Sequence, residues 1–126
     1  IMEVLIMPES PGVDNKIAVV RPSGRMMEPF ETSRIHKRVK KHIDQGNPWV
    51  VIDLGNVEWM NSKGIGMLVS CLTSCRDGDG LMVVARPSKK VKSLLMISQV
   101  IRLFDSYGSV REAKRALLEM KTAGTG

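Results

Sequence analysis

One serine stands where a helix is expected to begin, and that position allows two different roles. Residues 61–66 (NSKGIG) lie between an expected strand and an expected helix. As the N-cap of that helix, the Ser62 hydroxyl would accept a hydrogen bond from the backbone N–H of Ile65. The same place suits a phosphate, because the first turn of a helix presents unpaired N–H groups and the positive end of the helix dipole. Ser62 is therefore either a structural cap or a phosphoacceptor whose charge changes while the fold stays intact.

Other chemical signals in the chain are weak. Gly64 and Gly66 form a Gly-x-Gly pair, but Val69 stands where a dinucleotide-binding fingerprint has its third glycine. The two histidines, His36 and His42, both fall in an expected basic helix, so no nucleophile–histidine–acid arrangement can be assembled. We expect a protein that is not an enzyme and uses no cofactor.

The two cysteines have the spacing of core thiols. Cys71 and Cys75 lie four residues apart in an apolar segment, on one face of an expected helix. A disulfide between such neighbours is geometrically awkward, and no zinc-ligand spacing connects them to a histidine. We expect two reduced, buried thiols and no metal site.

The charge of the chain is its most unusual global property. Its 126 residues include 19 Lys and Arg against 13 Asp and Glu, for a formal net charge of +6. That balance raises nucleic acids and acidic membranes as partners, but only 4% of the residues are aromatic, which leaves few platforms for stacking bases. No apolar run approaches the roughly 20 residues that cross a bilayer, and no signal peptide is visible. We interpret the charge as a solvated surface, and expect a cytoplasmic protein without direct nucleic-acid binding or membrane insertion.

The elements that would position these residues alternate between strands and helices. Strands are expected at residues 2–7, 16–21, 49–54, 81–85 and 101–104, and helices at 29–45, at 64–76, after Ser88 and after the capping box at 109–112. Residues 22–24 are expected to end the second strand, and residues 55–61 to form a connecting loop. This order predicts one α/β domain over residues 2–121, with a flexible tail at 122–126. Its sheet should be mixed and mostly parallel, with four to five strands, an antiparallel first strand at one edge and about four helices.

Several of these segments resemble a known family. Residues 51–68 (VIDLGNVEWMNSKGIGML) resemble the signature of STAS domains, the anti-sigma factor antagonists of bacteria. That signature is an apolar strand, Asp-Leu, a loop, then Asp-Ser-Ser/Ala-Gly-Leu-Gly and an apolar helix. Residues 87–95 and 101–113 resemble a later helix opening and the closing segment of the family. The resemblance covers residues 3–118 and implies a STAS-like fold.

The resemblance also implies a function and a site. In this family, an anti-sigma factor that is also a serine kinase phosphorylates the serine at the position of Ser62. The unphosphorylated form binds that kinase, the phosphorylated form is released, and a serine phosphatase resets it. The residues expected to contact the partner around this serine are Met60, Asn61, Lys63, Gly64 and Met67.

Three positions depart from the family pattern. Asn61 replaces the usual Asp, Lys63 replaces a small residue, and Arg25 stands where an acidic residue is common, so all three make the local charge more positive. Some STAS domains are not switched by phosphorylation and serve transporters instead. The alternative is therefore an accessory or regulatory module of a transporter, for example an ABC lipid-transport subunit. A nucleic-acid binder led by the basic first helix is a third, weaker alternative.

Overall fold

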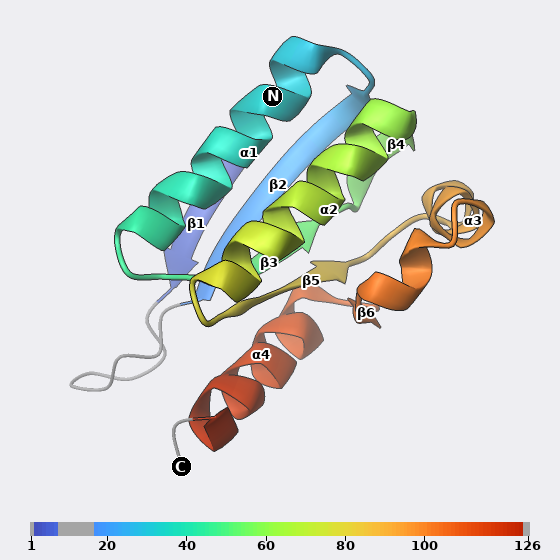
Figure 1. Cartoon of the computed structure of the whole chain (residues 1–126). Coiled ribbons are helices and arrows are strands. Elements are labelled where there is room, and N and C mark those ends of the chain that lie inside the picture. Colours follow the sequence, from blue (N-terminus) through green and yellow to red (C-terminus); the bar gives the residue numbers. More distant parts are fainter. Residues whose placement is uncertain (1, 8–16, 125–126) are drawn as a thin grey trace.

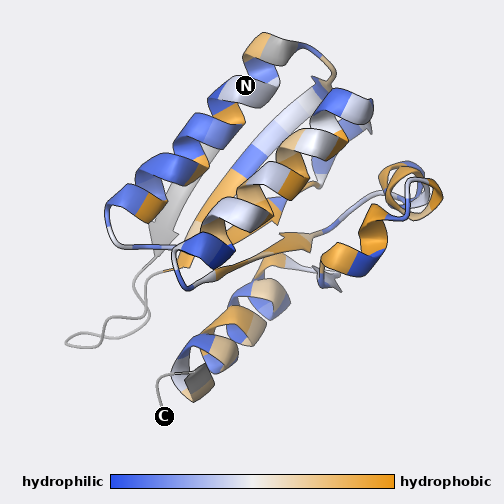
Figure 2. Ribbon diagram, viewed as in Figure 1, coloured by the Kyte–Doolittle hydropathy of each residue, from blue (hydrophilic) through white to orange (hydrophobic). Residues whose placement is uncertain are grey.

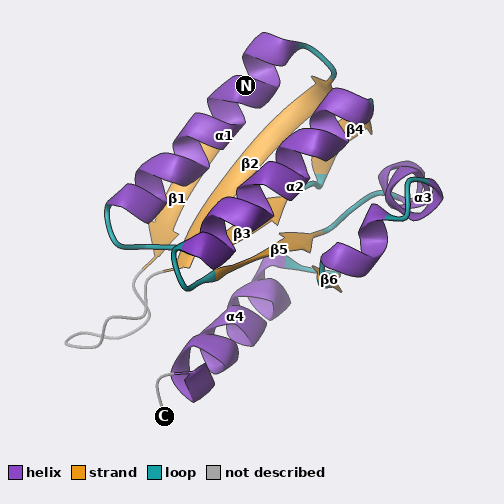
Figure 3. Cartoon of the chain, in the orientation of Figure 1, coloured by secondary structure: helices purple, strands orange, loops and turns teal. Residues whose placement is uncertain are grey.

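The chain folds by alternating strands with helices, as Figures 1 and 3 show. The computed structural model describes residues 2–7 and 17–124, and the segment between the first two expected strands lies outside this part. The elements are β1 (Met2–Met7), β2 (Ile17–Met26), α1 (Pro29–Asp44), β3 (Trp49–Asp53), β4 (Asn56–Met60), α2 (Ser62–Asp77), β5 (Leu81–Ala85), α3 (Lys89–Ile97), the 3₁₀ helix η1 (Val100–Leu103), β6 (Ser106–Tyr107) and α4 (Val110–Gly124).

The strands form one mostly parallel sheet. Its order is β1-β2-β3-β5-β6, and β4 pairs with β2 beside this path. Strands β2, β3, β5 and β6 run parallel, β4 is parallel to β2, and β1 runs antiparallel to β2. Together with the four α-helices, this confirms the predicted α/β class and its mostly parallel sheet.

The sheet is covered on both faces, which explains the continuous apolar runs of its central strands. Val50 and Ile52 of β3 belong to the larger core, under α1 and α2. Val51 between them points to the opposite face, where it shares a second core with Leu117 of α4. Figure 2 shows the hydrophobic colouring of the central strands between these helices. Because side chains alternate between the two faces along β3, this strand contributes residues to two separate cores.

The second strand and the following loop differ from the prediction. β2 does not end at residues 22–24 but continues to Met26, and most of the expected loop at 55–61 is strand β4. Beyond Val20, β2 separates from β3 and pairs with β4, from Ser23 opposite Asn56 to Met26 opposite Met60. The register shifts just after Gly24, whose φ of 78° favours glycine. A strand that changes partners in this way leaves no local pattern in the sequence.

The last strand was also predicted at the wrong place. Residues 100–103 form η1 instead, which follows Gln99 in the left-handed region at φ 63°, and the strand is the two-residue β6. A short apolar run can pack against a core from a turn as well as from a strand, as the partly buried Val100 and Ile101 do here, so its pattern does not separate the two. The expected cap of α4 is confirmed, because the backbone N–H of Glu112 donates to Ser109 Oγ at 3.1 Å. Helix α4 continues to Gly124, so residues 122–124 are helical rather than part of a tail.

Candidate functional site

The helix that carries Ser62 is capped by the residue before it. Asn61 is the N-cap of α2, and its Oδ1 accepts hydrogen bonds from the backbone N–H groups of Lys63 at 3.0 Å and Gly64 at 3.2 Å. The Ile65 N–H donates to the backbone carbonyl of Asn61 at 3.0 Å. The prediction that Ser62 caps the helix is therefore wrong. Asn61 supplies the cap, because an amide oxygen one residue earlier already reaches the unpaired N–H groups.

The end of β2 holds this loop from the other side. Asn61 Nδ2 donates to the Met27 carbonyl at 3.2 Å, and the Asn61 N–H donates to the Met26 carbonyl at 3.4 Å. A Cβ atom on Gly64 would lie 2.5 Å from the Met26 oxygen and 2.9 Å from Met60 Cβ. Position 64 therefore has room for glycine alone, and the close approach of β2, β4 and α2 sets the position of the loop.

The Ser62 side chain is left accessible by this arrangement. Ser62 is the first residue of α2 and is exposed, and among the described residues its hydroxyl has no hydrogen-bond partner. The first turn of α2 contains no acidic residue, and the exposed Lys63 follows directly. A phosphate on Ser62 would meet the positive end of the helix dipole and a neighbouring ammonium group.

A groove lies beside Ser62, between the first turns of α1 and α2. It has a volume of about 360 Å³ and is lined by Thr32, Ser33, His36, Lys63 and Met67. Lys63 belongs to both the groove and the first turn of α2, so it connects this hollow to Ser62. Burial, and then the nearby charge of Lys40, lower the pKa of His36, which favours its neutral form. The groove therefore offers polar and apolar contacts with one cation at the Ser62 end.

The residues expected to contact a partner differ in exposure. Ser62 and Lys63 are exposed and Asn61 is partly exposed. Gly64 and Met60 are buried, and Met60 lies in the larger core. Met60 therefore supports the loop from inside, while Ser62, Lys63 and the groove supply its surface.

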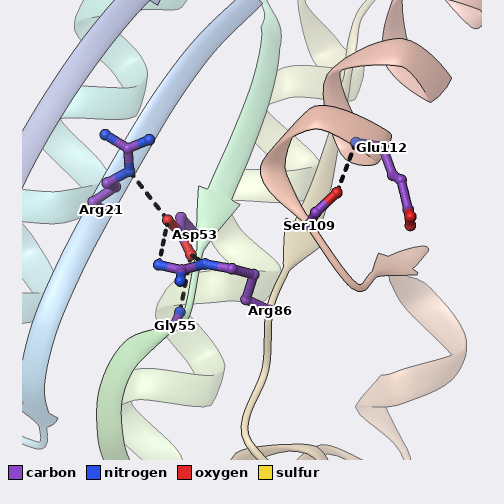
Figure 4. Close-up of polar contacts among 6 residues, drawn as sticks. All are labelled: Arg21, Asp53, Gly55, Arg86, Ser109 and Glu112. Carbon is purple, nitrogen blue, oxygen red and sulfur yellow. Dashed lines mark hydrogen bonds and ion pairs between the residues drawn. The ribbon is translucent and has the colours of Figure 1, made fainter.

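A buried carboxylate that the sequence patterns did not predict as a centre lies upstream of this loop (Figure 4). Asp53, at the end of β3, is 1% exposed. Its Oδ1 accepts from Arg86 Nε at 2.9 Å, and its Oδ2 accepts from Arg86 Nη2 at 3.0 Å and from Arg21 Nε at 3.1 Å. Burial by itself would raise the pKa of Asp53, but hydrogen bonds from Arg86 and from the Gly55 N–H outweigh it and hold the pKa below its ordinary value.

This cluster fixes the turn that leads into β4. The Gly55 N–H donates to Asp53 Oδ1 at 3.0 Å, and a Cβ on Gly55 would lie 2.4 Å from the Arg86 guanidinium. Arg86 itself adopts a left-handed backbone conformation, with φ 54°. The available signal was an acidic residue that ends a continuous apolar strand, because a buried charge requires partners. Its two arginine partners come from β2 and from the residue after β5, so no local pattern identified them.

The two cysteines lie in the core of the domain. Cys71 and Cys75 are free and buried, as expected, and burial raises the pKa of each thiol to about 12. The described residues contain no group of three His, Cys, Asp or Glu side chains that could hold a metal ion. Among the same residues, no helix has the length and apolar character needed to span a membrane.

Comparisons with known proteins give one family and one fold. The family model described as the STAS domain matches residues 6–113. No curated protein matches the chain. An anti-sigma factor antagonist from Mycobacterium paratuberculosis is similar in structure, with a TM-score of 0.73 at 19% identity over 92% of this chain and 93% of that chain. The Bacillus cell fate determinant SpoIIAA in its phosphorylated form has a TM-score of 0.63 at 16% identity, over 88% and 96% of the two chains.

Part of a transporter chain has the same fold. The murine Slc26a9 anion transporter has a TM-score of 0.71 at 10% identity, over 92% of this chain but 22% of that chain. The fold therefore occurs both as a protein of similar length and as a part of a much longer transporter chain.

Proposed function

The chain belongs to the STAS domain family, and we propose that it is an anti-sigma factor antagonist that changes partners through phosphorylation of Ser62. One observation carries this proposal: the exposed Ser62 hydroxyl takes no part in capping α2. Because Asn61 makes the capping hydrogen bonds, a phosphate on Ser62 removes no bond that holds the loop. The site can therefore change its charge without changing its backbone.

The proposed partner is an anti-sigma factor with serine kinase activity, in the cytoplasm. In the unphosphorylated state, Ser62, Lys63 and the groove beside them form its docking surface. The partner then catalyses attack of Ser62 Oγ on the γ-phosphorus of ATP, with ADP as the leaving group and the hydroxyl proton passing to a base of the kinase. This chain is the substrate of that reaction and not its catalyst.

Phosphorylation would release the partner through charge and size. The phosphate adds nearly two negative charges at the centre of the docking surface, while the N-terminus of α2 stabilises it within this chain. A serine phosphatase would hydrolyse phospho-Ser62 and return the chain to its binding form. Lys63, which replaces a small residue of the family pattern, would favour the phosphorylated state by its charge.

The decisive experiment is phosphorylation by the co-encoded serine-kinase anti-sigma factors. Incubation with each kinase and ATP, followed by mass spectrometry, should give one phosphate on Ser62. Ser62→Ala should remove it, whereas Ser70→Ala, which changes an exposed serine further along α2, should not. A chain that acquires no phosphate and forms no complex with any of these kinases would rule out the proposal.

A second candidate function follows from the similarity to an anion transporter. In that case the chain would be an accessory or regulatory module of a transporter, and the same surface would bind without a phosphorylation switch. Isolation of the tagged chain in complex with transporter subunits, with Ser62 unmodified, would favour this function over the first.

A further inference from the structure

The side of the molecule formed by α3 and η1 exposes large apolar side chains. Met96 and Ile97, at the end of α3, are 58% and 80% exposed, and Leu103 of η1 is 44% exposed. These three residues, together with the exposed cations Lys89 and Lys92, are called the α3–η1 surface below. In Figure 1 α3 stands at the edge of the molecule, on the side away from α1, and η1 packs between α3 and α2. The surface is therefore separate from Ser62 and its groove.

The helical spacing explains why this face is exposed. Val91 and Leu95 are fully buried and attach α3 to the body of the protein beside β4. Lys89, Lys92 and Met96 are separated by three and four residues, so they share the opposite face of the helix. The outward face of α3 thus begins with lysines and ends with apolar side chains.

The charge on this part of the chain has one sign. Residues 80–104 contain five Lys and Arg and no Asp or Glu. Two of the five are exposed but already contact other residues of this chain: Arg86 binds Asp53, and Lys90 Nζ lies 5.7 Å from the centre of the Trp59 ring. The other three, Lys89, Lys92 and Arg102, are exposed. Their charge is available to an external anionic surface.

We propose that the α3–η1 surface docks on an anionic lipid bilayer. Exposed apolar side chains beside lysines are the chemistry of interfacial binding, in which the apolar tips enter the headgroup region and the cations contact lipid phosphates. The surface projects outward, and the described groove beside Ser62 lies elsewhere, between α1 and α2. A bilayer accepts projecting tips such as Ile97 without a matching pocket, whereas a protein partner would need an apolar hollow placed beside its acidic groups. The chain would lie on the membrane and would not span it.

Co-sedimentation of the full chain with vesicles tests this proposal. Vesicles of phosphatidylglycerol and phosphatidylcholine in equal parts should bind the chain at low salt, and vesicles of phosphatidylcholine alone should not. Added salt should weaken the binding, because it screens the attraction between lysines and lipid phosphates. Failure to bind anionic vesicles at low salt would overturn the proposal.

Two variants of the surface have matched controls on α1. Lys89→Glu/Lys92→Glu should lower vesicle affinity about tenfold or more. Lys37→Glu/Lys40→Glu makes the same charge change, with the same spacing, on exposed positions of α1 and should have a much smaller effect. Equal losses in the two variants would mean that net charge alone drives binding, and would overturn the assignment to α3–η1.

The apolar part is tested by Met96→Gln/Ile97→Gln. This variant should also lose about tenfold in affinity, whereas Phe30→Gln, at a residue 71% exposed on α1, should not. The melting temperatures of both should match the parent, because these side chains are exposed. Retained vesicle binding in the double variant would contradict the proposal. Binding to polyglutamate but not to vesicles, through Lys89 and Lys92, would reassign the surface to an acidic protein.

Discussion

At the scale of single residues, two neighbours have separate tasks. Asn61 holds the first turn of α2 through its side-chain amide, and Ser62 presents an exposed hydroxyl. In a helix where the serine were also the cap, a phosphate would remove one of the capping bonds. Here the proposed phosphorylation and the structural support belong to different side chains, so each can be tested alone.

Ser62→Asp should weaken binding to the proposed anti-sigma factor partner about tenfold or more, because it places a carboxylate inside the proposed docking surface. The melting temperature should stay within about 2 °C of the parent, since an acidic residue at a helix N-terminus is favourable. Calorimetric titration and thermal unfolding measure the two effects, and Ser62→Ala is the control that keeps the surface uncharged. A large fall in melting temperature would show that Ser62 has a structural role.

Asn61→Ala should lower the free energy of unfolding by about 1–2 kcal/mol, because the Lys63 and Gly64 N–H groups lose their acceptor. Urea denaturation gives this value. Ser62→Ala should change it by less than about 0.5 kcal/mol. If the two substitutions cost the same, the separation of tasks described above would be incorrect.

At the scale of elements, the contact of β2 and β4 with α2 decides where the serine lies. β2 leaves β3 and pairs with β4, and the first turn of α2 then packs directly on the Met26 carbonyl and on Met60. The two glycines of the Gly-x-Gly pair therefore differ. Gly64 faces this contact, whereas a Cβ on Gly66 would meet nothing within 4 Å.

Gly64→Ala should lower the free energy of unfolding by about 1–3 kcal/mol, because the added methyl group overlaps a backbone carbonyl that cannot move aside freely. Gly66→Ala should instead raise it by about 0.5–1 kcal/mol, since alanine is the better helix former where space is available. Chemical denaturation of both variants checks the pair. A destabilised Gly66→Ala variant would show that this space is not open in solution.

At the scale of the whole molecule, one carboxylate joins the strands on which the site depends. Asp53 binds Arg21 of β2 and Arg86, which follows β5, and it also fixes the Gly55 turn into β4. Only the carboxylate is buried: the Arg21 and Arg86 side chains are 25% and 44% exposed, so water can partly replace Asp53 as their partner if it is removed. The stability of the domain should still depend on the ionisation of Asp53.

Asp53→Asn should lower the free energy of unfolding at neutral pH by about 1–2 kcal/mol, because charge-assisted hydrogen bonds are lost while the partly exposed arginines regain water. The pKa of Asp53 is lower in the folded chain than in the unfolded chain. Its contribution is therefore fully present above the ordinary carboxyl range, and is lost as the pH falls through the folded-state pKa. Urea denaturation at a series of pH values should show a smaller acid-induced loss in Asp53→Asn than in the parent. Parallel pH curves for the two proteins would exclude Asp53 as the titrating group.

The sequence by itself determined the α/β class, the central strands, the core thiols and the family, because each depends on local periodicity or on a contiguous motif. Val50, Val51 and Ile52 indicate a strand buried on both faces wherever they occur. The partner change of β2, the Gly64 contact and the two arginines around Asp53 were decided by the tertiary structure alone. Each joins residues about 30 or more positions apart, and only folding brings them together. The choice of the capping residue was also decided by the tertiary structure. Both Asn61 and Ser62 are residue types that can cap a helix. Asn61 donates hydrogen bonds to the Met26 and Met27 carbonyls, and these bonds hold it at the N-cap position of α2.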